Sequence, residues 1–150
     1  MASDETGGSD WIPADDYGRS LTGFGVNLLV RDVPRSLDFL RQVLGLSPVH
    51  ATRDFAVLRH GTQEWMLHSD ASYHANPLLA LTGDGALRGA GIELRLYGLD
   101  PDLCAARAEA AGHGVLQAPR DKPHGLREAY LVDPDGYVWV PSRALPPGPR

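Results

Sequence analysis

The sequence Asp-Pro-Asp-Gly at residues 133–136 constrains the fold more than any other stretch, because it separates two runs that have the pattern of strands. Residues 127–132 alternate in polarity, which is typical of a strand with one buried face. Proline presets φ at the second position of a turn, and aspartate and glycine suit the positions around it. The stretch therefore predicts a β-hairpin whose second strand starts at Val138.

A second informative stretch, residues 27–46, has the pattern of a strand that runs into a helix. Asp32 is a typical N-cap residue for that helix. Leu37, Leu40 and Leu44 then recur at helical spacing, which predicts one buried helix face. A glycine at position 45 is expected to end the helix.

The second half of the chain repeats this organisation. Overlaying Leu37 on Leu103 aligns the two predicted helices at an offset of 66 residues, and Leu103, Ala106 and Ala110 are expected to line the buried face of the second helix. Neither half is long enough to bury a large core alone, so we expect the halves to pair. The predicted boundaries are a flexible acidic tail at 1–20, module one at 21–69, a linker at 70–89, module two at 90–145 and a short tail at 146–150.

Composition excludes several classes of protein. With 150 residues, of which 43% are hydrophobic, the chain is expected to form one domain. The net charge is −5 and there is no basic stripe, which argues against a nucleic-acid partner. No apolar run approaches the roughly 18 residues of a membrane span, and no signal-peptide pattern opens the sequence, so we expect a cytoplasmic protein. The single cysteine, Cys104, excludes an internal disulfide and is expected in the core.

The two stretches together resemble the vicinal oxygen chelate superfamily, which includes glyoxalase I, bleomycin-resistance proteins, fosfomycin-resistance enzymes and extradiol dioxygenases. The similarity lies in the Val-x-Asp-x-x-x-Ser-Leu-x-Phe pattern that starts at Val30, with Leu40 where the family usually has tyrosine, and in the closing Asp-Pro-Asp-Gly hairpin. It extends over residues 21–145. The resemblance implies an α+β fold in which two tandem β-α-β-β-β modules form a curved, eight-stranded half-barrel around a ligand-binding cleft.

The resemblance also implies positions for one divalent metal, held by His, His or Gln, Glu and Glu from four strands. The position seven residues before the first helix-capping aspartate is Gly25, and the position seven residues after the start of the hairpin turn is Val140. By the internal repeat Val140 matches Met66, and the position in the fifth strand falls at Gly91. None of these four residues supplies the oxygen or imidazole donor that such metals need. We therefore predict no usual metal and no cofactor, with a divalent metal as the alternative.

Strand alternation predicts further residues on the cleft face, among them Asn27, His68 and Glu93. These three side chains allow an alternative, displaced metal site, whereas the preferred interpretation is a polar ligand pocket with Glu93 and Arg95 as a pair. His74 is placed at the cleft mouth, and the two tryptophans, Trp65 and Trp139, are expected to face the helices. The predicted ligand-binding residues are Asn27, Glu64, Met66, His68, Glu93, Arg95, His124 and Val140.

Three functions follow as hypotheses. The first is a metal-free protein that binds a small organic molecule in the cleft, as bleomycin-resistance proteins do, and that forms a homodimer. The second is a glyoxalase-like lyase, an isomerase or a dioxygenase, which would use a displaced metal or acid–base chemistry by Glu93 or His68. The third is a non-catalytic interaction module with a dimer contact at Trp11.

Overall fold

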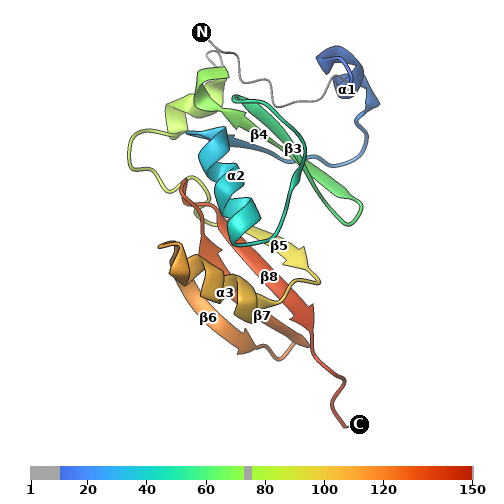
Figure 1. Cartoon of the computed structure of the whole chain (residues 1–150), viewed down its shortest axis with the longest axis vertical. Helices are drawn as coiled ribbons and strands as arrows, with labels where there is room; N and C mark the ends of the chain where they lie inside the picture. Colours follow the sequence, from blue (N-terminus) through green and yellow to red (C-terminus); the bar gives the residue numbers. More distant parts are fainter. Residues whose placement is uncertain (1–10, 73–75, 150) are drawn as a thin grey trace.

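The computed structural model describes residues 11–72 and 76–149, and it contains two modules with the same order of elements (Figure 1). The first module consists of β1 (Asn27–Val30), α2 (Val33–Gln42), β2 (Pro48–Ala51), β3 (Phe55–His60) and β4 (Gln63–Ser69). The second consists of β5 (Glu93–Tyr97), α3 (Pro101–Ala110), β6 (Gly114–Asp121), β7 (Leu126–Val132) and β8 (Val138–Ala144). Three short helices lie outside them: α1 (Ala14–Ser20), η1 (Asp70–Ser72) and η2 (Pro77–Leu81).

Each module forms its own four-stranded mixed sheet. The strand orders are β1-β4-β3-β2 and β5-β8-β7-β6, with β1 parallel to β4 and β5 parallel to β8. Within the described residues no strand pairing joins one sheet to the other. The predicted α+β class with two β-α-β-β-β modules is confirmed, and the eight strands are divided between two sheets.

Both long helices begin at an aspartate cap, as the sequence predicted for each. The Asp32 carboxylate accepts a hydrogen bond from the Arg35 amide at 3.0 Å, and the Asp100 carboxylate accepts from the Asp102 amide at 2.9 Å. The caps are 68 residues apart (100 − 32), so the predicted offset of 66 is wrong by two residues. The cause is Leu103, which is 46% exposed rather than buried. The buried residues of α3 are instead Pro101, Cys104, Ala105 and Ala108.

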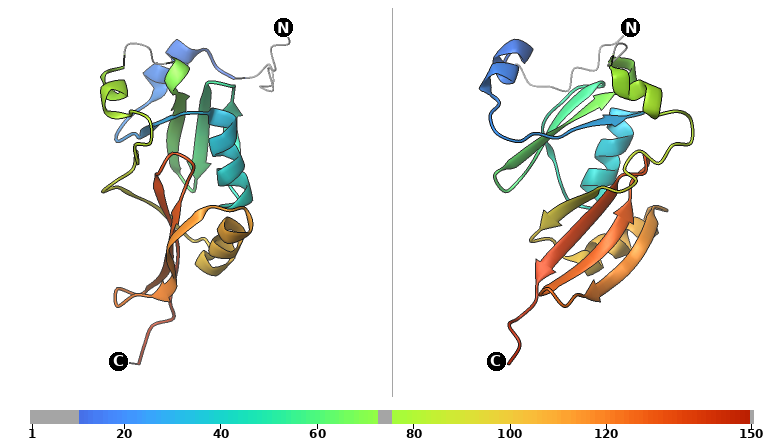
Figure 2. Two further views of the ribbon diagram at one scale, coloured as in Figure 1. Left: turned by 90° about the vertical axis from the view of Figure 1, so that its left-hand side faces the viewer. Right: turned by 180° about the vertical axis from the view of Figure 1, so that it is seen from behind.

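The hydrophobic core lies between the helices and the sheets. Leu37, Leu40 and Leu44 of the first module are all buried in it, as predicted. Trp65 and Trp139 belong to the same core, and their ring centroids are 5.8 Å apart. Figure 2 shows α2 and α3 on the same side of the molecule. The two tryptophans therefore join the cores of the two modules.

The predicted hairpin turn, residues 133–136, also fastens module two to module one. The buried Asp135 carboxylate accepts hydrogen bonds from the Arg31 amide at 2.9 Å and from its guanidinium at 3.2 Å, and Ser36 Oγ donates to it at 3.4 Å. Tyr137, directly after the turn, donates its hydroxyl to the Leu29 carbonyl at 2.8 Å. We call residues 133–137 the junction turn.

Asp133 holds the junction turn together from inside. Its carboxylate accepts hydrogen bonds from the Asp135 and Tyr137 amides and from Trp139 Nε1, at 2.9, 3.0 and 2.9 Å. Burial nevertheless raises the pKa of Asp133 to about 6 from its ordinary value of 3.8, because desolvation outweighs these three donors.

A pH dependence of stability follows from Asp133. Its pKa is higher in the folded than in the unfolded chain, so its contribution is fully present below about pH 4 and is lost as the pH rises through 6. We expect the difference in unfolding free energy between wild type and Asp133→Asn to fall by roughly 2–3 kcal/mol between pH 4 and pH 7. Urea unfolding of both proteins across this range measures it, and a pH-independent difference would contradict it.

The segment before β1 differs from its prediction. Residues 1–10 of the predicted tail lie outside the described residues, but residues 14–20 form α1 and Tyr17 is 8% exposed. The reason is apolar packing: the Trp11 and Tyr17 rings lie 5.3 Å apart, and Tyr17 meets Phe55 of β3 at 6.4 Å. A flexible tail therefore does not describe residues 11–20.

Candidate functional site

Each sheet has one face turned away from its helix, and we call these two surfaces the open faces. In β4 the core residues Trp65 and Leu67 alternate with half-buried Glu64, Met66 and His68, which therefore lie on the open face. Cross-strand pairing extends the same face to Asn27 opposite Met66, and to Phe55 opposite His68. In module two, the pairing places Glu93 and Arg95 beside Val138 and Val140.

On the open face of module one, the structure brings two predicted site residues into contact. His68 Nδ1 and Asn27 Oδ1 lie 2.6 Å apart, and because that oxygen only accepts, the imidazole nitrogen donates. The His68 ring also lies 4.8 Å from the Phe55 ring. Burial lowers the pKa of His68, which favours the neutral imidazole. Glu64, further along β4, is bound to Arg59 and lies 3.4 Å from the Tyr17 hydroxyl.

Aromatic side chains from the N-terminal segment cover this open face. Trp11 stacks on His50 with ring centroids 4.4 Å apart, and burial lowers the pKa of His50. A cavity of about 410 Å³ lies between this segment and the sheet, lined by Trp11, Tyr17, His50, Phe55, Met66 and His68, among others. No ligand role is predicted for this segment from its residues alone. Trp11 and Tyr17, two aromatic residues in a mostly polar stretch, are the sequence feature that could have indicated that the segment packs on the sheet.

On the open face of module two, an ion-pair network replaces the aromatic cover. Arg95 donates to Glu93 at 2.9 Å and to the Glu128 carboxylate, which is 1% exposed. Burial acts to raise the pKa of Glu128, but the hydrogen bond and charge of Arg95 outweigh it and hold the pKa below its usual value. Tyr130 and His124 complete the network at 3.2 and 3.4 Å from Glu128. Sequence reasoning found Glu93, Arg95 and His124, but it missed Glu128 and Tyr130, whose alternation in β7 was the available signal.

One of the four metal-ligand positions changes when it is counted from the observed cap of the second helix, Asp100. Seven residues before Asp100 is Glu93, not Gly91, and strand pairing agrees: Asn27 pairs with Met66 as Arg95 pairs with Val140. The four positions therefore become Gly25, Met66, Glu93 and Val140, of which only Glu93 offers a metal donor.

These residues do not fit the metal site usual in the family's enzymes. Gly25 and Met66 line one cavity, Glu93 lines another, and Val140 is fully buried. Within residues 11–72 and 76–149 no group of three or more His, Cys, Asp or Glu side chains is placed to hold a metal ion. Within one chain the alternative set of Asn27, His68 and Glu93 is divided between the two sheets, and Glu93 is paired with Arg95. His74 lies outside the described residues.

Comparison with known proteins agrees with this architecture. Residues 25–140 match the sequence model of the Glyoxalase/Bleomycin resistance protein/Dioxygenase superfamily. A search of curated proteins finds no match. No helix in the described part of the chain is long and apolar enough to cross a membrane.

Several solved structures are similar in fold. A glyoxalase-related enzyme from Fulvimarina pelagi is 18% identical, with a TM-score of 0.64, over 81% of this chain and 87% of that one. A glyoxalase/bleomycin resistance protein/dioxygenase family enzyme from Burkholderia phytofirmans PsJN is 21% identical, with a TM-score of 0.66, over 81% and 97%. TioX from Micromonospora sp. ML1 is 26% identical, with a TM-score of 0.57, over 85% and 100%.

Proposed function

Because the chain belongs to the glyoxalase/bleomycin resistance protein/dioxygenase superfamily, we propose that it binds a small organic molecule at its open faces without the divalent metal usual in the family's enzymes. The observation that carries this proposal is the chemistry of the four metal positions, three of which are Gly25, Met66 and Val140. A thioether is a poor ligand for hard cations, and glycine and valine side chains offer none. What remains at the open faces suits an organic ligand, with aromatic rings in module one and a polar network in module two.

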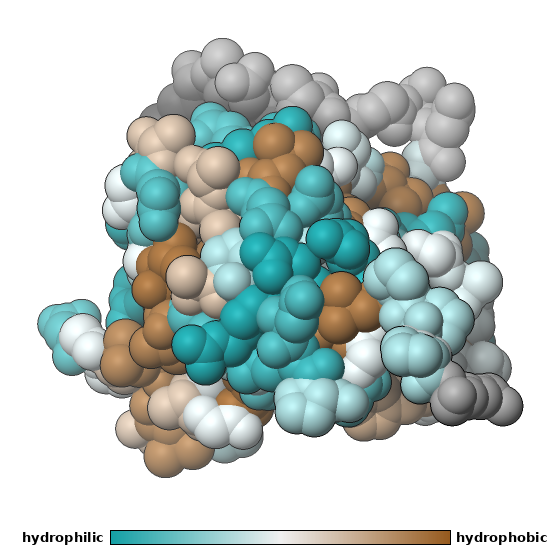
Figure 3. Space-filling view, turned by 90° about the horizontal axis from the view of Figure 1, so that it is seen from below, coloured by the Kyte–Doolittle hydropathy of each residue, from teal (hydrophilic) through white to brown (hydrophobic). Residues whose placement is uncertain are grey.

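We further propose that the complete binding cleft forms between two copies of the chain. In one chain both open faces turn to the side opposite α2 and α3 (Figure 2). The cavity at His68 is lined by the N-terminal segment and module one, and the cavity at Glu93 is lined by module two alone. Ile92 and Leu116 of module two are 52% and 69% exposed, although apolar side chains of this size gain from being covered. Figure 3 shows apolar residues gathered along one side of the molecule, with polar residues across its middle. A homodimer that pairs these surfaces would enclose the open faces.

The first test is elemental analysis of protein purified without chelator or nickel resin, together with native mass spectrometry. We expect less than about 0.1 equivalent of Zn, Fe, Mn or Ni per chain and a mass of two chains. One equivalent of a tightly held metal would overturn the metal-free proposal.

The second test is calorimetric titration with a panel of aromatic and glycopeptide ligands. Any ligand that binds at the open face of module one should lose about ten-fold in affinity in His68→Ala, because the imidazole and its contacts with Asn27 and Phe55 are removed. Arg53→Ala is the control, since Arg53 is exposed outside the cavity. A panel in which nothing binds, or affinities that are the same in both variants, would count against a site at this face.

An enzyme is the second candidate, and the place of His68 on the open face, where burial lowers its pKa, favours it. A neutral imidazole can accept a proton from carbon beside a carbonyl group. His68→Gln should then abolish any turnover that is found, while Glu93→Gln should matter less because Arg95 already engages the Glu93 carboxylate. Turnover that survives His68→Gln would remove His68 as the base.

A further inference from the structure

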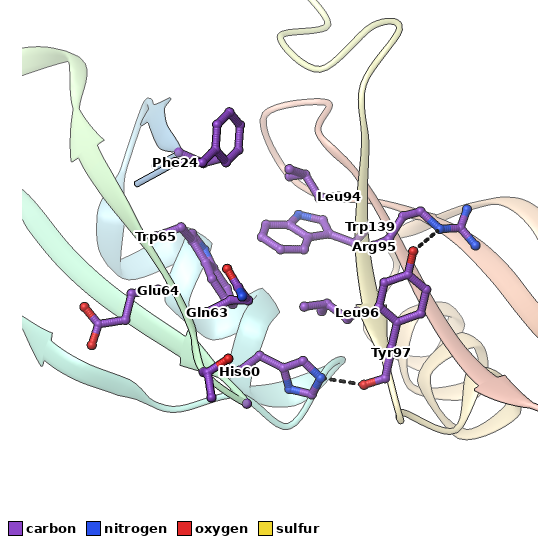
Figure 4. A pocket seen from close by; sticks show the side chains of 13 residues that line it. Phe24, His60, Gln63, Glu64, Trp65, Leu94, Arg95, Leu96, Tyr97 and Trp139 are labelled. Atoms are coloured by element: carbon purple, nitrogen blue, oxygen red, sulfur yellow. Dashed lines mark hydrogen bonds between the residues drawn. The ribbon is translucent and has the colours of Figure 1, made fainter. Parts of the chain in front are cut away.

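We propose that the cavity between the two modules is a second binding site for a neutral, planar aromatic molecule. Its lining includes Glu64 and Arg95 of the open faces, but it shares no residue with the cavity between the N-terminal segment and the first sheet. This seam cavity has a volume of about 440 Å³, within the range of small-molecule sites. It lies between the β3–β4 hairpin of module one and β5 of module two (Figure 4). It does not depend on what the open faces bind.

The walls of the seam cavity are flat and apolar. Trp65 of module one meets Trp139, Leu94 and Leu96 of module two, as Figure 4 shows. The two indole ring centroids are 5.8 Å apart, so a ligand would stack beside this pair and not between its rings. Aromatic walls favour a flat ligand, because rings stack or meet edge to face over a large area.

One wall also offers an unused hydrogen-bond donor. Trp139 Nε1 donates to Asp133, whereas Trp65 Nε1 is buried and has no acceptor among the described residues. A buried N–H without a partner is costly, so a ligand that carries a carbonyl or ring nitrogen would satisfy it after a small movement of the indole. The favoured ligand is therefore an aromatic ring system with a hydrogen-bond acceptor.

The charges at the cavity point to a neutral ligand. Glu64 and Arg95 are its acidic and basic lining residues, and both are already paired: Glu64 with Arg59, and Arg95 with Glu93 and Glu128. His60 Nε2 lies 2.6 Å from the Tyr97 carbonyl, and it therefore donates there and ties the hairpin to β5 at one end of the cavity. A charged ligand would therefore find no unpaired carboxylate or guanidinium of opposite charge among these two lining residues.

Phe24 stands at the rim of the cavity (Figure 4). Its side chain is 91% exposed, although it is a large apolar group, and it lies between Gly23 and Gly25. Gly23 has a φ of +76°, a backbone conformation that favours glycine. Phe24 also borders the neighbouring cavity at Gly25 and Met66, whereas Tyr97 on the opposite rim lines the seam cavity and not that one. Variants of both residues therefore distinguish the two cavities.

The test uses acridone, a neutral three-ring molecule with a carbonyl acceptor, and its anionic analogue acridone-4-carboxylate. In a Trp11→Phe background the remaining tryptophans, Trp65 and Trp139, both line the cavity. Energy transfer from them to the probe then reports that it binds the chain, and the variants below report where. We expect saturable binding of acridone at one molecule per chain, and binding at least ten-fold weaker for the carboxylate.

Three variants locate the probe. Phe24→Ser and Tyr97→Ser should each weaken acridone about ten-fold, since each removes an aromatic wall. Trp65→Phe should weaken it about five-fold, since one aromatic ring stays while the N–H and the second ring of the indole are lost. Leu81→Ser removes an apolar side chain that is 77% exposed and lies outside the cavities described, and it should change nothing.

Three results would overturn the proposal. The first is no saturable binding of acridone. The second is affinity that Tyr97→Ser and Trp65→Phe leave unchanged, which would place the probe elsewhere. The third is equal affinity for acridone and its carboxylate, which would refute the preference for a neutral ligand.

Discussion

Replacing Asp135 by alanine should lower the free energy of unfolding by about 3 kcal/mol, although the residue lies in a turn. The carboxylate is 3% exposed and accepts from the Arg31 amide, the Arg31 guanidinium and Ser36 Oγ. The substitution removes all three bonds and leaves their donors at a junction that water reaches only in part. Arg31 keeps a bond to the Ala86 carbonyl, which limits the loss.

Urea unfolding followed by tryptophan fluorescence measures this effect, because Trp65 and Trp139 meet at the same junction. Asp84→Ala is the matched control: Asp84 is also an aspartate in a loop, but it is exposed, and its replacement should change stability by less than about 0.5 kcal/mol. If the two variants are equally stable, the junction turn does not fasten the modules as described.

Replacing Gly89 by alanine should cost a similar amount, about 3 kcal/mol, for a different reason. A Cβ at this position would lie 2.6 Å from Tyr137 Cα and 3.0 Å from the Gly136 carbonyl oxygen. Both are backbone atoms of the junction turn, which is fixed by Asp133 and Asp135 and cannot move aside cheaply. The segment before β5 therefore crosses the turn at a separation that only glycine allows.

Gly83 provides the control in the same segment. A Cβ there meets nothing within 4 Å, and neither Gly83 nor Gly89 has a positive φ. Gly83→Ala should therefore be neutral, or stabilising by up to about 0.5 kcal/mol, because alanine restricts the unfolded chain. Equal melting temperatures for the two variants would show that the backbone at Tyr137 can move away from the added Cβ without loss of stability.

The parts of the fold that sequence predicted are those set by neighbouring residues. The hairpin at residues 133–136, the caps at Asp32 and Asp100, and the buried face of α2 each depend on a few consecutive positions. The offset between the modules failed because it relied on Leu103, and a leucine on a short helix can face solvent when alanines and a cysteine suffice to fill the space below. That error displaced one metal position from Glu93 to Gly91.

The candidate site was predictable to the extent that strand alternation decides it. Glu64, Met66 and His68 lie on one face of β4, as the period of two predicts. Other contacts at the open faces join residues that are distant in sequence. Glu128 is 33 residues from Arg95, and Tyr17 is 47 residues from Glu64. A pattern of neighbouring residues cannot predict pairs so far apart in the sequence. The position of α1 over the open face of module one involves one of them, Tyr17 with Glu64.

The junction turn has a consequence for how the chain is made. Asp135 is separated from Arg31 and Ser36 by 104 and 99 residues, so their bonds cannot form until synthesis has advanced that far. On the ribosome, module one therefore emerges with Trp65 and its surroundings uncovered, and it waits for module two before that apolar surface is sealed. Contacts so distant in sequence also slow folding, because a long loop must close before they form. We therefore expect the nascent first half to be the stage at which this protein is most prone to aggregate.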